Sequence, residues 1–295
     1  MTKNNQTTRS NCREGQRFEG YQLVELLAAG AHSEVWSAIS VQGEICVLKL
    51  FLPEESDEAR KEYATAVSFT HPNILSPIAL LSDEARCAMV LPYCKGRSVD
   101  AVVGHMNEGL LWQLVRDVSG ALDKIHSQGW MHLSVNPSNI LWDGTSFLLA
   151  DYGACAAADA ERDAVATGGG AYQYDAPERF SKASCACDVW SLGATVFHLY
   201  MGCHVFNGLG GSVQQPHSPL PYMRKSMPAL SELVMGCLAY NPSERPLPSV
   251  LYERACEEMR KRLMLQKSRP KKQDAQTSAT TRNSTFWPDD MIDFQ

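Results

Sequence analysis

The stretch from Met131 to Gly153, MHLSVNPSNILWDGTSFLLADYG, constrains the fold and chemistry of this chain more than any other. Its apolar runs predict two short strands, Ile140–Trp142 and Phe147–Ala150, joined by a tight turn. Asn139 and Asp151 lie at the two outer ends of this predicted hairpin, which brings them close together. Amide and carboxylate oxygens are hard ligands that suit Mg²⁺. The stretch therefore predicts a magnesium site at the open end of a hairpin.

Composition limits the classes of protein to which this chain can belong. A chain of 295 residues with 44% hydrophobic content can bury a substantial core. The net charge of -6 and the pI near 5.8 argue against a general nucleic-acid binder, which usually carries a basic face. No apolar run approaches bilayer length, and the first residues lack the apolar core of a signal peptide. We therefore expect a cytoplasmic protein that binds neither nucleic acid nor membrane.

Ten cysteines are scattered along the chain without a C-x-x-C pair. Cys185 and Cys187 are close together, but no second ligand pair lies at the spacing of a zinc finger. Most such cysteines in a long intracellular chain act as small buried hydrophobes. The pattern favours free thiols over disulfides or a zinc site.

The first part of the chain has the period of β-strands. Residues 1–17 are polar, and we expect them to be disordered. A helix-like pattern covers residues 54–69. Five extended segments precede and follow that helix, at residues 21–28, 33–40, 44–51, 78–81 and 87–91. The pattern predicts an N-terminal lobe over about residues 18–94, built from a five-stranded antiparallel sheet and one helix.

The helical period dominates the second part of the chain. Apolar residues recur at three- and four-residue intervals from Leu111 to Ile125, which predicts an amphipathic helix. Residues 188–201 are apolar nearly all round, as in a helix buried inside a lobe. Two further helices are predicted at 229–238 and 249–265. These helices form a C-terminal lobe over about residues 95–265, followed by a basic and polar tail at 266–295, so the predicted class is α+β with two lobes.

Several motifs resemble those of the protein kinases. Residues 132–139, HLSVNPSN, and 151–153, DYG, are similar to the catalytic loop H-R-D-L-x-x-x-N and the metal-binding D-F-G. Residues 170–178, GAYQYDAPE, resemble the run G-T-x-x-Y-M-A-P-E. Residues 188–193, DVWSLG, resemble the start of the central buried helix, and residues 241–246, NPSERP, resemble a D-P-x-x-R-P run. The resemblance covers about residues 21–265 and implies the two-lobed protein-kinase fold.

The resemblance implies structural roles for three charged residues. In the family, the equivalents of Glu178 and Arg245 form a buried ion pair. The equivalent of Asp188 holds the backbone of the catalytic loop. A buried charge needs a partner, so breaking such a pair typically costs about 3–5 kcal/mol.

The resemblance also implies a nucleotide-binding side. Residues 27–35, LAAGAHSEV, are similar to the kinase Gly-rich loop, although Ala28 and Ser33 replace two of its three glycines. Taken alone, this segment also fits an ordinary hairpin turn. Lys49 matches the lysine that contacts the α- and β-phosphates. Glu62 is its predicted partner carboxylate, and Glu58, one turn earlier, is the alternative.

Residues 91–96, LPYCKG, look like the hinge whose main chain hydrogen-bonds adenine. Leu91 falls at the gatekeeper position, Pro92 removes one N–H donor, and Cys94 is the expected adenine contact. The resemblance implies ATP and Mg²⁺ as cofactors, with Asn139 and Asp151 as metal ligands. The implied nucleotide contacts are Ala28, Gly30, Ser33, Val35, Lys49, Glu62, Leu91, Cys94 and Leu141.

The phosphate-acceptor side departs from the family pattern. Ser134 stands where an Asp accepts the proton of the substrate hydroxyl, and Asn136 stands where a Lys steadies the transferred phosphate. Ala171 replaces a Thr that contacts both, and Leu133 replaces an Arg that pairs with a phosphorylated activation loop. A serine hydroxyl is not basic at neutral pH, and loss of a positioned general base lowers the rate by roughly 10²–10⁴. The sequence therefore predicts poor phosphoryl transfer.

The sequence reveals no replacement for that base. Asp143 lies beyond Asn139 along a strand, about 13 Å away at strand rise. Asp151 is expected to bind the metal. The activation segment is rich in Ala and Gly, and its few phosphorylatable side chains are Thr167 and Tyr172.

Three hypotheses follow. The leading one is a pseudokinase that binds Mg-ATP and regulates or scaffolds a protein partner, with phosphoryl transfer absent or strongly impaired. The alternative is an active but slow serine/threonine kinase that transfers the γ-phosphate to hydroxyls of a protein substrate. The third is a binding module without nucleotide, favoured by the degenerate Gly-rich loop and Pro92. A magnesium-dependent rise in melting temperature with ATP separates the third hypothesis from the others.

Overall fold

The computed structural model describes residues 12–84, 86–95, 97–160, 171–220, 222–223 and 227–268. The chain divides into two compact units. The first comprises residues 1–70 and 75–93, and the second comprises residues 71–74 and 94–295. Parts of the predicted hinge, the activation segment and both predicted tails lie outside the described residues.

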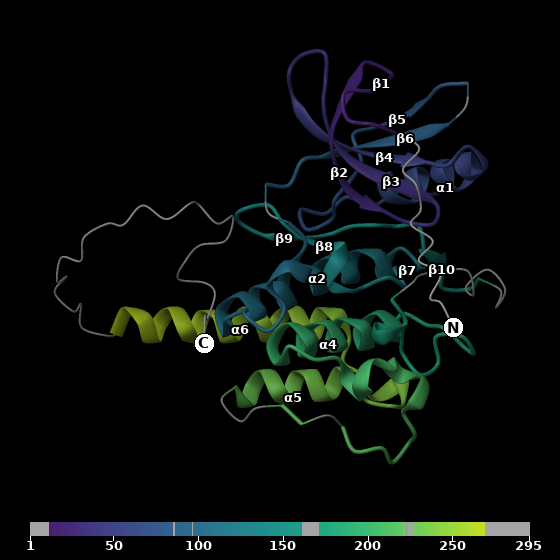
Figure 1. Ribbon diagram of the computed structural model, residues 1–295. Helices are drawn as coiled ribbons and strands as arrows, with labels where there is room; N and C mark the ends of the chain where they lie inside the picture. Colours follow the sequence, from purple (N-terminus) through teal and green to yellow (C-terminus); the bar gives the residue numbers. More distant parts are fainter. Residues whose placement is uncertain are drawn as a thin grey trace, which may run out of the picture. The chain divides into compact units, whose positions relative to one another are not determined.

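The first unit is built on one antiparallel sheet (Figure 1). Its strands lie in the order β1-β2-β3-β4-β6-β5. Helix α1, Ser56–Ser68, packs against this sheet at β6. The strand bounds are Arg17–Phe18 for β1, Tyr21–Ala29 for β2, Ser33–Ile39 for β3, Ile45–Phe51 for β4, Ala79–Ser82 for β5 and Cys87–Pro92 for β6. The five predicted strands and the predicted helix are therefore confirmed.

The sheet has a sixth strand that the sequence did not predict. Strand β1 pairs with β2 through Arg17↔Gln22 and Phe18↔Tyr21. Upstream of it, the Cys12 side chain is 4% exposed and belongs to the hydrophobic core. The prediction of disorder up to residue 17 is therefore wrong from Cys12 onward, because this thiol and Phe18 pack into the core.

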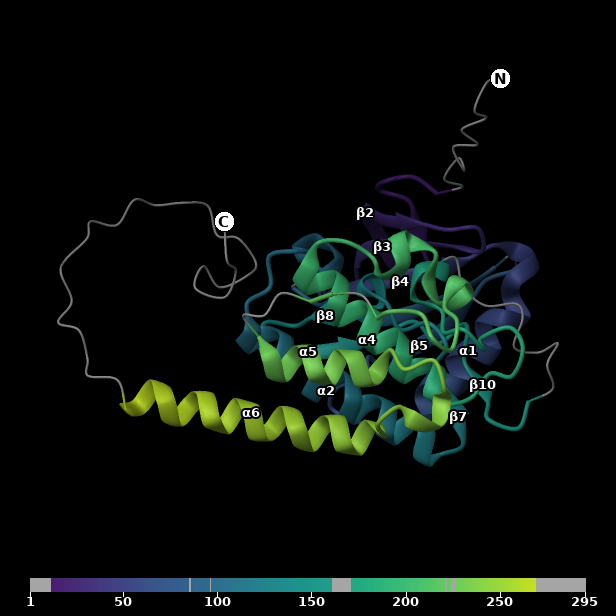
Figure 2. The ribbon, with the colours of Figure 1, turned by 90° about the horizontal axis from the view of Figure 1, so that it is seen from below.

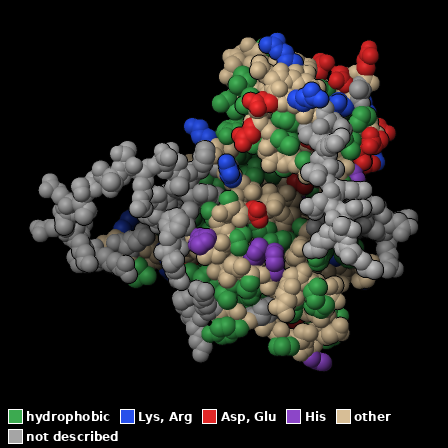
Figure 3. Space-filling view, viewed as in Figure 1, with side chains coloured by type: hydrophobic (Ala, Val, Ile, Leu, Met, Phe, Trp, Pro, Cys, Tyr) green, Lys and Arg blue, Asp and Glu red, His purple; other side chains and the backbone are tan. Residues whose placement is uncertain are grey.

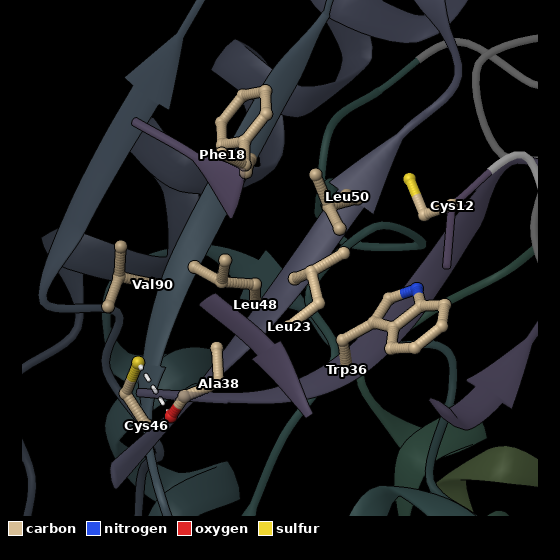
Figure 4. Close-up of a cluster of buried hydrophobic side chains, with 10 residues drawn as sticks. Cys12, Phe18, Leu23, Trp36, Ala38, Cys46, Leu48, Leu50 and Val90 are labelled. Carbon is tan, nitrogen blue, oxygen red and sulfur yellow. Dashed lines mark hydrogen bonds between the residues drawn. The ribbon is translucent and has the colours of Figure 1, made fainter. Parts of the chain in front are cut away.

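One hydrophobic cluster of the first unit covers one face of the sheet (Figure 4), and a separate cluster joins the sheet to Ala59 of α1. Trp36 and Ala38 alternate along β3, and Leu48 and Leu50 alternate along β4, so their side chains share a face. Cys46 lies in the same cluster, where its Sγ donates to the carbonyl of Ala38 at 3.7 Å. All ten cysteines are free thiols, and several of them serve as core side chains.

The second unit is mainly helical. Its long helices are α2, Glu108–Ser127, α4, Ala186–Met201, α5, Pro228–Cys237, and α6, Pro248–Ser268. Helix α6 packs along α2, and α4 packs against both α2 and α5 (Figure 2). Residues 187–199 of α4 are buried on every face, which confirms the prediction of a helix inside the lobe. Helix α6 continues past the predicted end at residue 265, into the segment predicted as a tail.

Two short sheets complete the second unit. Strands β8, Ile140–Trp142, and β9, Phe147–Leu149, form the predicted hairpin. Strand β7, Trp130–Met131, pairs with β10, Ala156–Ala157. Short 3₁₀ turns lie between these elements, at Val99–Val102, Pro137–Asn139, Tyr172–Tyr174, Val205–Gly208, Gly210–Val213 and Pro242–Glu244.

Local chemistry sets the ends of the helices. Asn107 caps α2 by accepting a hydrogen bond from the N–H of Leu110 at 3.0 Å, so the helix begins before the first apolar residue of its pattern. Helix α4 ends at Gly202, whose φ of 72° lies in the left-handed region that glycine adopts without strain.

The described surface carries mixed charge. Figure 3 shows Lys and Arg side chains interspersed with Asp and Glu over the face of the first unit in view. Among the described residues, no helix is both long and apolar enough to cross a membrane.

Candidate functional site

A buried carboxylate holds the loop between β7 and β8. Asp188, in the first turn of α4, is fully buried. Its two oxygens accept hydrogen bonds from the backbone N–H groups of His132 at 2.8 Å and Leu133 at 2.6 Å. His126 Nε2 lies 2.8 Å from the same carboxylate. These bonds confirm the role that the kinase resemblance implies for Asp188.

The electrostatics of Asp188 follow from these bonds. Burial acts to raise the pKa of the carboxyl, but the hydrogen bond and charge of His126 and the backbone N–H of His132 lower it overall. Asp188 is therefore ionised at neutral pH. The anchored residue Leu133 has a φ of 62°, a left-handed conformation that is strained for a leucine. The two bonds from Asp188 stabilise that backbone.

A buried ion pair between Arg245 and Glu178 lies in the same unit. Arg245 Nη1 and Nη2 lie 2.6 and 2.9 Å from the two carboxylate oxygens of Glu178. The guanidinium also donates to the carbonyls of Ala186, Ala239 and Tyr240. The Arg245 side chain is fully buried. The predicted buried pair is confirmed, and its geometry is the bidentate one that only arginine offers.

Ser134 lies in the anchored loop and is tied to Asn139. The Nδ2 of Asn139 donates to both the carbonyl and the Oγ of Ser134, each at 2.8 Å. The position of the missing base therefore holds a neutral hydroxyl that is hydrogen-bonded to the predicted metal ligand. It cannot accept a proton as a carboxylate would.

Asn136, the position of the missing lysine, has a structural role. Its side chain is buried and accepts from the N–H of Ser138 at 3.0 Å, capping the turn Pro137–Asn139. Its Nδ2 donates to the carbonyl of Ser134 at 3.0 Å. The amide thus closes the loop on itself and brings no positive charge to it.

The hairpin brings the two predicted metal ligands to its open end, as the sequence predicts. The N–H of Ala150 donates to the carbonyl of Asn139 at 2.9 Å, which places Asp151 next to that end. Asp151 is exposed and has a φ of 67°. Because the Nδ2 of Asn139 donates to Ser134, the amide oxygen is the atom left to bind a cation.

This donor set fits Mg²⁺ that is bound together with phosphate. It offers one amide oxygen and one carboxylate, and Mg²⁺ commonly uses one or two protein ligands and completes its shell with water and phosphate oxygens. Within the described ranges, no group of three or more His, Cys, Asp or Glu side chains could hold a metal ion. The set is therefore suited to a metal that arrives with a nucleotide.

The acceptor-side substitutions lie together around one small hollow. Ser134 and Asn136 line it from the anchored loop, and Ala171 lines it from the segment that follows the activation loop. The full lining is Leu133, Ser134, Val135, Asn136, Ala171, Tyr174, Asp175 and Ser191. The four acceptor-side departures, Leu133 among them, are thus neighbours in space.

Asp175, which the sequence analysis missed, also lines this hollow. Its side chain is 17% exposed, and its Oδ1 lies 3.8 Å from Nε of Arg179. Its Oδ2 is buried and has no hydrogen-bond partner among the described residues. Burial raises the pKa of this carboxyl to about 6, and Arg179 only partly offsets that effect. The overlooked signal was an Asp where the family run Y-M-A-P-E has a Met.

The segment that carries Asp175 is packed tightly against two glycines. The N–H of Gly211 donates to the carbonyl of Asp175 at 2.8 Å. A Cβ at Gly211 would collide with the backbone nitrogen of Pro177, and one at Gly210 would collide with the carbonyl of Tyr172. Position 175 is therefore fixed by main-chain contacts.

Two histidines pack against Tyr174 in the segment that carries Asp175. The hydroxyl of Tyr174 lies 2.6 Å from Nδ1 of His198, and the ring of His198 stacks on His204 at 3.9 Å between centroids. Burial lowers the pKa of His198 to about 4, so the ring is neutral at pH 7 and pairs with the hydroxyl as a neutral imidazole. Ser191 donates to the carbonyl of Tyr174 at 2.6 Å.

In the first unit, Lys49 is paired with Glu62. Lys49 Nζ lies 2.7 and 2.8 Å from the two oxygens of Glu62, and the side chains are 14% and 7% exposed. Glu58 is exposed and pairs with Lys61 at 2.7 Å. Of the two carboxylates that the sequence left open, Glu62 is therefore the partner.

The segment that resembles the Gly-rich loop is the turn between β2 and β3. The N–H of Gly30 donates to the carbonyl of Ser33 at 2.9 Å, and Ala28 pairs with Val35 in the ladder. A Cβ at Gly30 would meet only ordinary contacts, and its φ is not in the left-handed region. The fold itself does not require glycine at this position.

Of the remaining predicted nucleotide residues, Leu91 and Leu141 lie in strands, and Cys94 follows β6 outside any strand or helix. Leu91 pairs with Val47 between β6 and β4. Burial raises the pKa of the Cys94 thiol to about 11. Leu141 lies in β8 and forms an isolated bridge with Ser98.

Comparison with known proteins agrees with this architecture. Residues 21–256 match the family model described as protein kinase domain. Serine/threonine-protein kinase PknD of Mycobacterium tuberculosis is 28% identical over 253 residues, covering 78% of this chain and 38% of that protein. Cytokinesis protein sepH of Aspergillus terreus is 26% identical over 261 residues, covering 83% of this chain and 19% of that protein.

A plant relative gives the same result. CBL-interacting serine/threonine-protein kinase 2 of Arabidopsis thaliana is 27% identical over 199 residues, covering 62% of this chain and 44% of that protein. The chain thus spans less than half the length of these relatives. The matched residues include the anchored loop, the hairpin and the Glu178–Arg245 pair. This chain belongs to the protein kinase family.

Proposed function

We propose that this chain binds Mg-ATP and acts as a pseudokinase that regulates or scaffolds a protein partner, with phosphoryl transfer absent or strongly impaired. The observation that carries the proposal is the clustering of Ser134, Asn136 and Ala171 around one hollow. Changes scattered over the fold would suggest general drift. Because the changes are gathered on the acceptor side, they remove groups needed for phosphoryl transfer and leave those needed for nucleotide binding.

The nucleotide side supports binding. The Lys49–Glu62 pair is buried and closely spaced, as a lysine that positions phosphates requires. Asn139 and Asp151 lie at the open end of one hairpin, where they would hold Mg²⁺. When bound, that ion neutralises phosphate charge.

The acceptor side explains weak transfer. Ser134 offers a hydroxyl that accepts a hydrogen bond from Asn139, and Asn136 caps a turn instead of contacting phosphate. Kinases work at about 1–100 s⁻¹, and losing the general base lowers a rate by roughly 10²–10⁴. Any remaining transfer is then expected at about 1 s⁻¹ or below.

Asp175 favours a second candidate, the slow serine/threonine kinase. Its carboxyl lines the hollow that contains Ser134, and its pKa of about 6 suits a general base at neutral pH. This candidate predicts phosphorylation of a serine peptide that falls by at least about tenfold in Asp175→Asn while ATP binding is unchanged. Absence of labelled peptide above the Asp151→Ala background would reject it.

A thermal shift with ATP and Mg²⁺ tests the binding half of the proposal. A ligand at 100 times its Kd stabilises a protein by about 2.7 kcal/mol. Wild type should show a magnesium-dependent rise in melting temperature that Asp151→Ala removes. Asp123→Ala, which removes an exposed carboxylate from α2, is the matched control and should keep the rise. No rise in wild type would favour a binding module without nucleotide.

A further inference from the structure

The last turns of α6 extend past the helix on which it packs. Arg116 Nη1 of α2 lies 3.9 Å from the Sδ of Met259, and Glu108, the first residue of α2, pairs with Arg262. The two helices therefore run antiparallel, and α6 continues beyond the start of α2 to Ser268 (Figure 2). Side chains that follow Arg262 thus lie on a part of α6 that α2 does not cover.

One face of this helix end is apolar and flanked by cations. Leu263 and Met264 are 55% and 67% exposed. Arg260 lies one turn before this pair and Lys267 one turn after it, and both are exposed. The spacing i, i+3, i+4, i+7 puts all four residues on one side of the helix, which we call the α6 end face. Two adjacent apolar side chains between two cations suit a ligand that is both apolar and acidic.

The charge of this helix end is uneven. After Glu258, α6 contains cations and no acidic residue. Lys261 pairs with Glu258 at 2.7 Å, and Arg262 pairs with Glu108. The two cations of the α6 end face form no ion pair with another residue that the structure describes. Their charge is therefore available to a carboxylate from outside α6.

The chain itself carries a segment of complementary composition. Residues 286–295, FWPDDMIDFQ, contain three aromatic residues, three aspartates and no Lys or Arg. Aromatic rings pack favourably against the thioether of methionine, which contributes about 0.3–1.5 kcal/mol. Carboxylates form charge-assisted hydrogen bonds with Lys and Arg. The segment therefore offers both kinds of group that match the α6 end face.

The intervening residues are long enough to bring this segment back to the helix. The 17 residues 269–285 separate it from the end of α6. A flexible chain of that length has an r.m.s. span of about 21–25 Å. Leu263 lies only about 8 Å from Ser268 along the helix axis at 1.5 Å per residue. Such a tether holds the segment at roughly millimolar effective concentration, so a weak contact is still mostly formed.

We propose that residues 286–295 dock on the α6 end face of the same chain. An aromatic ring of the segment packs on Leu263 and Met264, and its aspartates face Arg260 and Lys267. Docking covers apolar surface that would otherwise be open to a second copy or another protein. The contact uses no residue of the proposed nucleotide or acceptor sides, so it is independent of the pseudokinase proposal.

A labelled peptide of residues 286–295 tests the contact by competition in the full chain. The double variant Phe286→Ala, Trp287→Ala removes two rings from the chain's own segment and should open the face. In fluorescence anisotropy, the peptide should bind this variant at least roughly tenfold more tightly than wild type, whose own segment competes. Equal affinities would overturn the proposal. A difference that disappears on dilution of the protein would show that a second copy supplies the segment, and would also overturn it.

Substitutions on α6 tie peptide binding to the face. In the double-variant background, Met264→Glu should weaken binding at least roughly tenfold, because it places a carboxylate on the apolar surface. Val250→Glu, at an exposed position in the first turn of α6, is the matched control and should leave binding unchanged. Both positions are exposed, so both variants should fold as wild type. Binding that survives Met264→Glu would place the peptide elsewhere and overturn the site.

A second peptide tests the charge pairing. Its three aspartates are replaced by asparagine, and it should bind the double variant roughly tenfold more weakly than the original peptide at low salt. Equal binding of the two peptides would overturn the pairing of the aspartates with Arg260 and Lys267.

Discussion

Ser134 and Asn139 illustrate how one substitution changes the chemistry of a loop and keeps its shape. The Asn139 amide donates to the backbone carbonyl and the hydroxyl of Ser134, so the loop stays closed without a carboxylate. The metal-side amide is therefore still oriented. Ser134 therefore removes the basic group from the loop, and a single substitution to Asp can restore it.

Ser134→Asp should raise phosphorylation of a serine peptide above wild type. A positioned general base contributes roughly 10²–10⁴ in rate, and the gain should be largest when combined with Asn136→Lys and Ala171→Thr. The measurement is transfer of labelled phosphate at saturating Mg-ATP. Ser134→Ala is the control and should give no gain. A flat response in the triple variant, with ATP still bound, would mean that the missing base is not the limiting defect.

Glu62→Gln should lower the free energy of unfolding by up to about 3 kcal/mol, because it removes the negative charge that contacts the buried Lys49 ammonium at 2.7 Å. It should also weaken the ATP-dependent thermal shift. Glu58→Gln, one turn earlier on α1, removes an exposed carboxylate and should change stability by less than about 0.5 kcal/mol. Equal effects of the two substitutions in denaturant titrations would refute the assignment of Glu62.

At the scale of elements, helix α4 organises the second unit. Its first turn carries Asp188, which anchors the loop before β8, and its Ala186 carbonyl accepts from Arg245. Ser191 and His198 support the segment that carries Asp175. Helix α4 therefore supports both the anchored loop and the Asp175 segment, which together line the hollow.

Arg245→Lys should destabilise the fold by about 3 kcal/mol or more. Lysine keeps the charge but loses the bidentate contact with Glu178 and most of the bonds to backbone carbonyls. Arg254→Lys on α6 is the matched control, since the Arg254 side chain is 42% exposed and its contacts with Glu232 and Glu258 are long, 3.4 and 3.7 Å. Urea unfolding compares the two, and a change below about 1 kcal/mol in Arg245→Lys would contradict the structural role.

Asp175 should make stability depend on pH in a specific direction. Burial raises the pKa of its carboxyl from 3.8 to about 6, so the ionised group disfavours the folded state above that pH. The penalty fades as pH falls from about 6 towards about 4, where the unfolded chain is protonated as well. Asp175→Asn should therefore melt higher than wild type at about pH 7.5, with a smaller gain at about pH 5. An equal gain at both values would contradict this environment.

Local sequence patterns predict the elements of this unit better than the contacts between them. Strand and helix positions follow from local periodicity, and Glu178, Asp188 and Arg245 carry motifs that survive in the sequence. The Asp at position 175 departs visibly from the family's Met, but its place beside the same hollow as Ser134 arises only when the chain folds. Cys12 was misassigned because a polar segment can still bury one thiol.

At the scale of the molecule, the two units carry different sets of the residues that the family uses for nucleotide binding and phosphoryl transfer. The first retains the Lys49–Glu62 pair on its sheet and helix. The second retains Asn139 and Asp151 on its hairpin but has lost the acceptor-side residues around one hollow. We therefore expect this protein to bind nucleotide with little or no phosphoryl transfer.

The most direct test measures both properties on the same sample. Wild-type protein is brought to saturating Mg-ATP, as judged by the thermal shift, and transfer of the labelled γ-phosphate to itself and to a serine peptide is followed. We expect clear nucleotide binding with transfer at least roughly 10² below the usual 1–100 s⁻¹. Robust transfer that Asp151→Ala abolishes would contradict it.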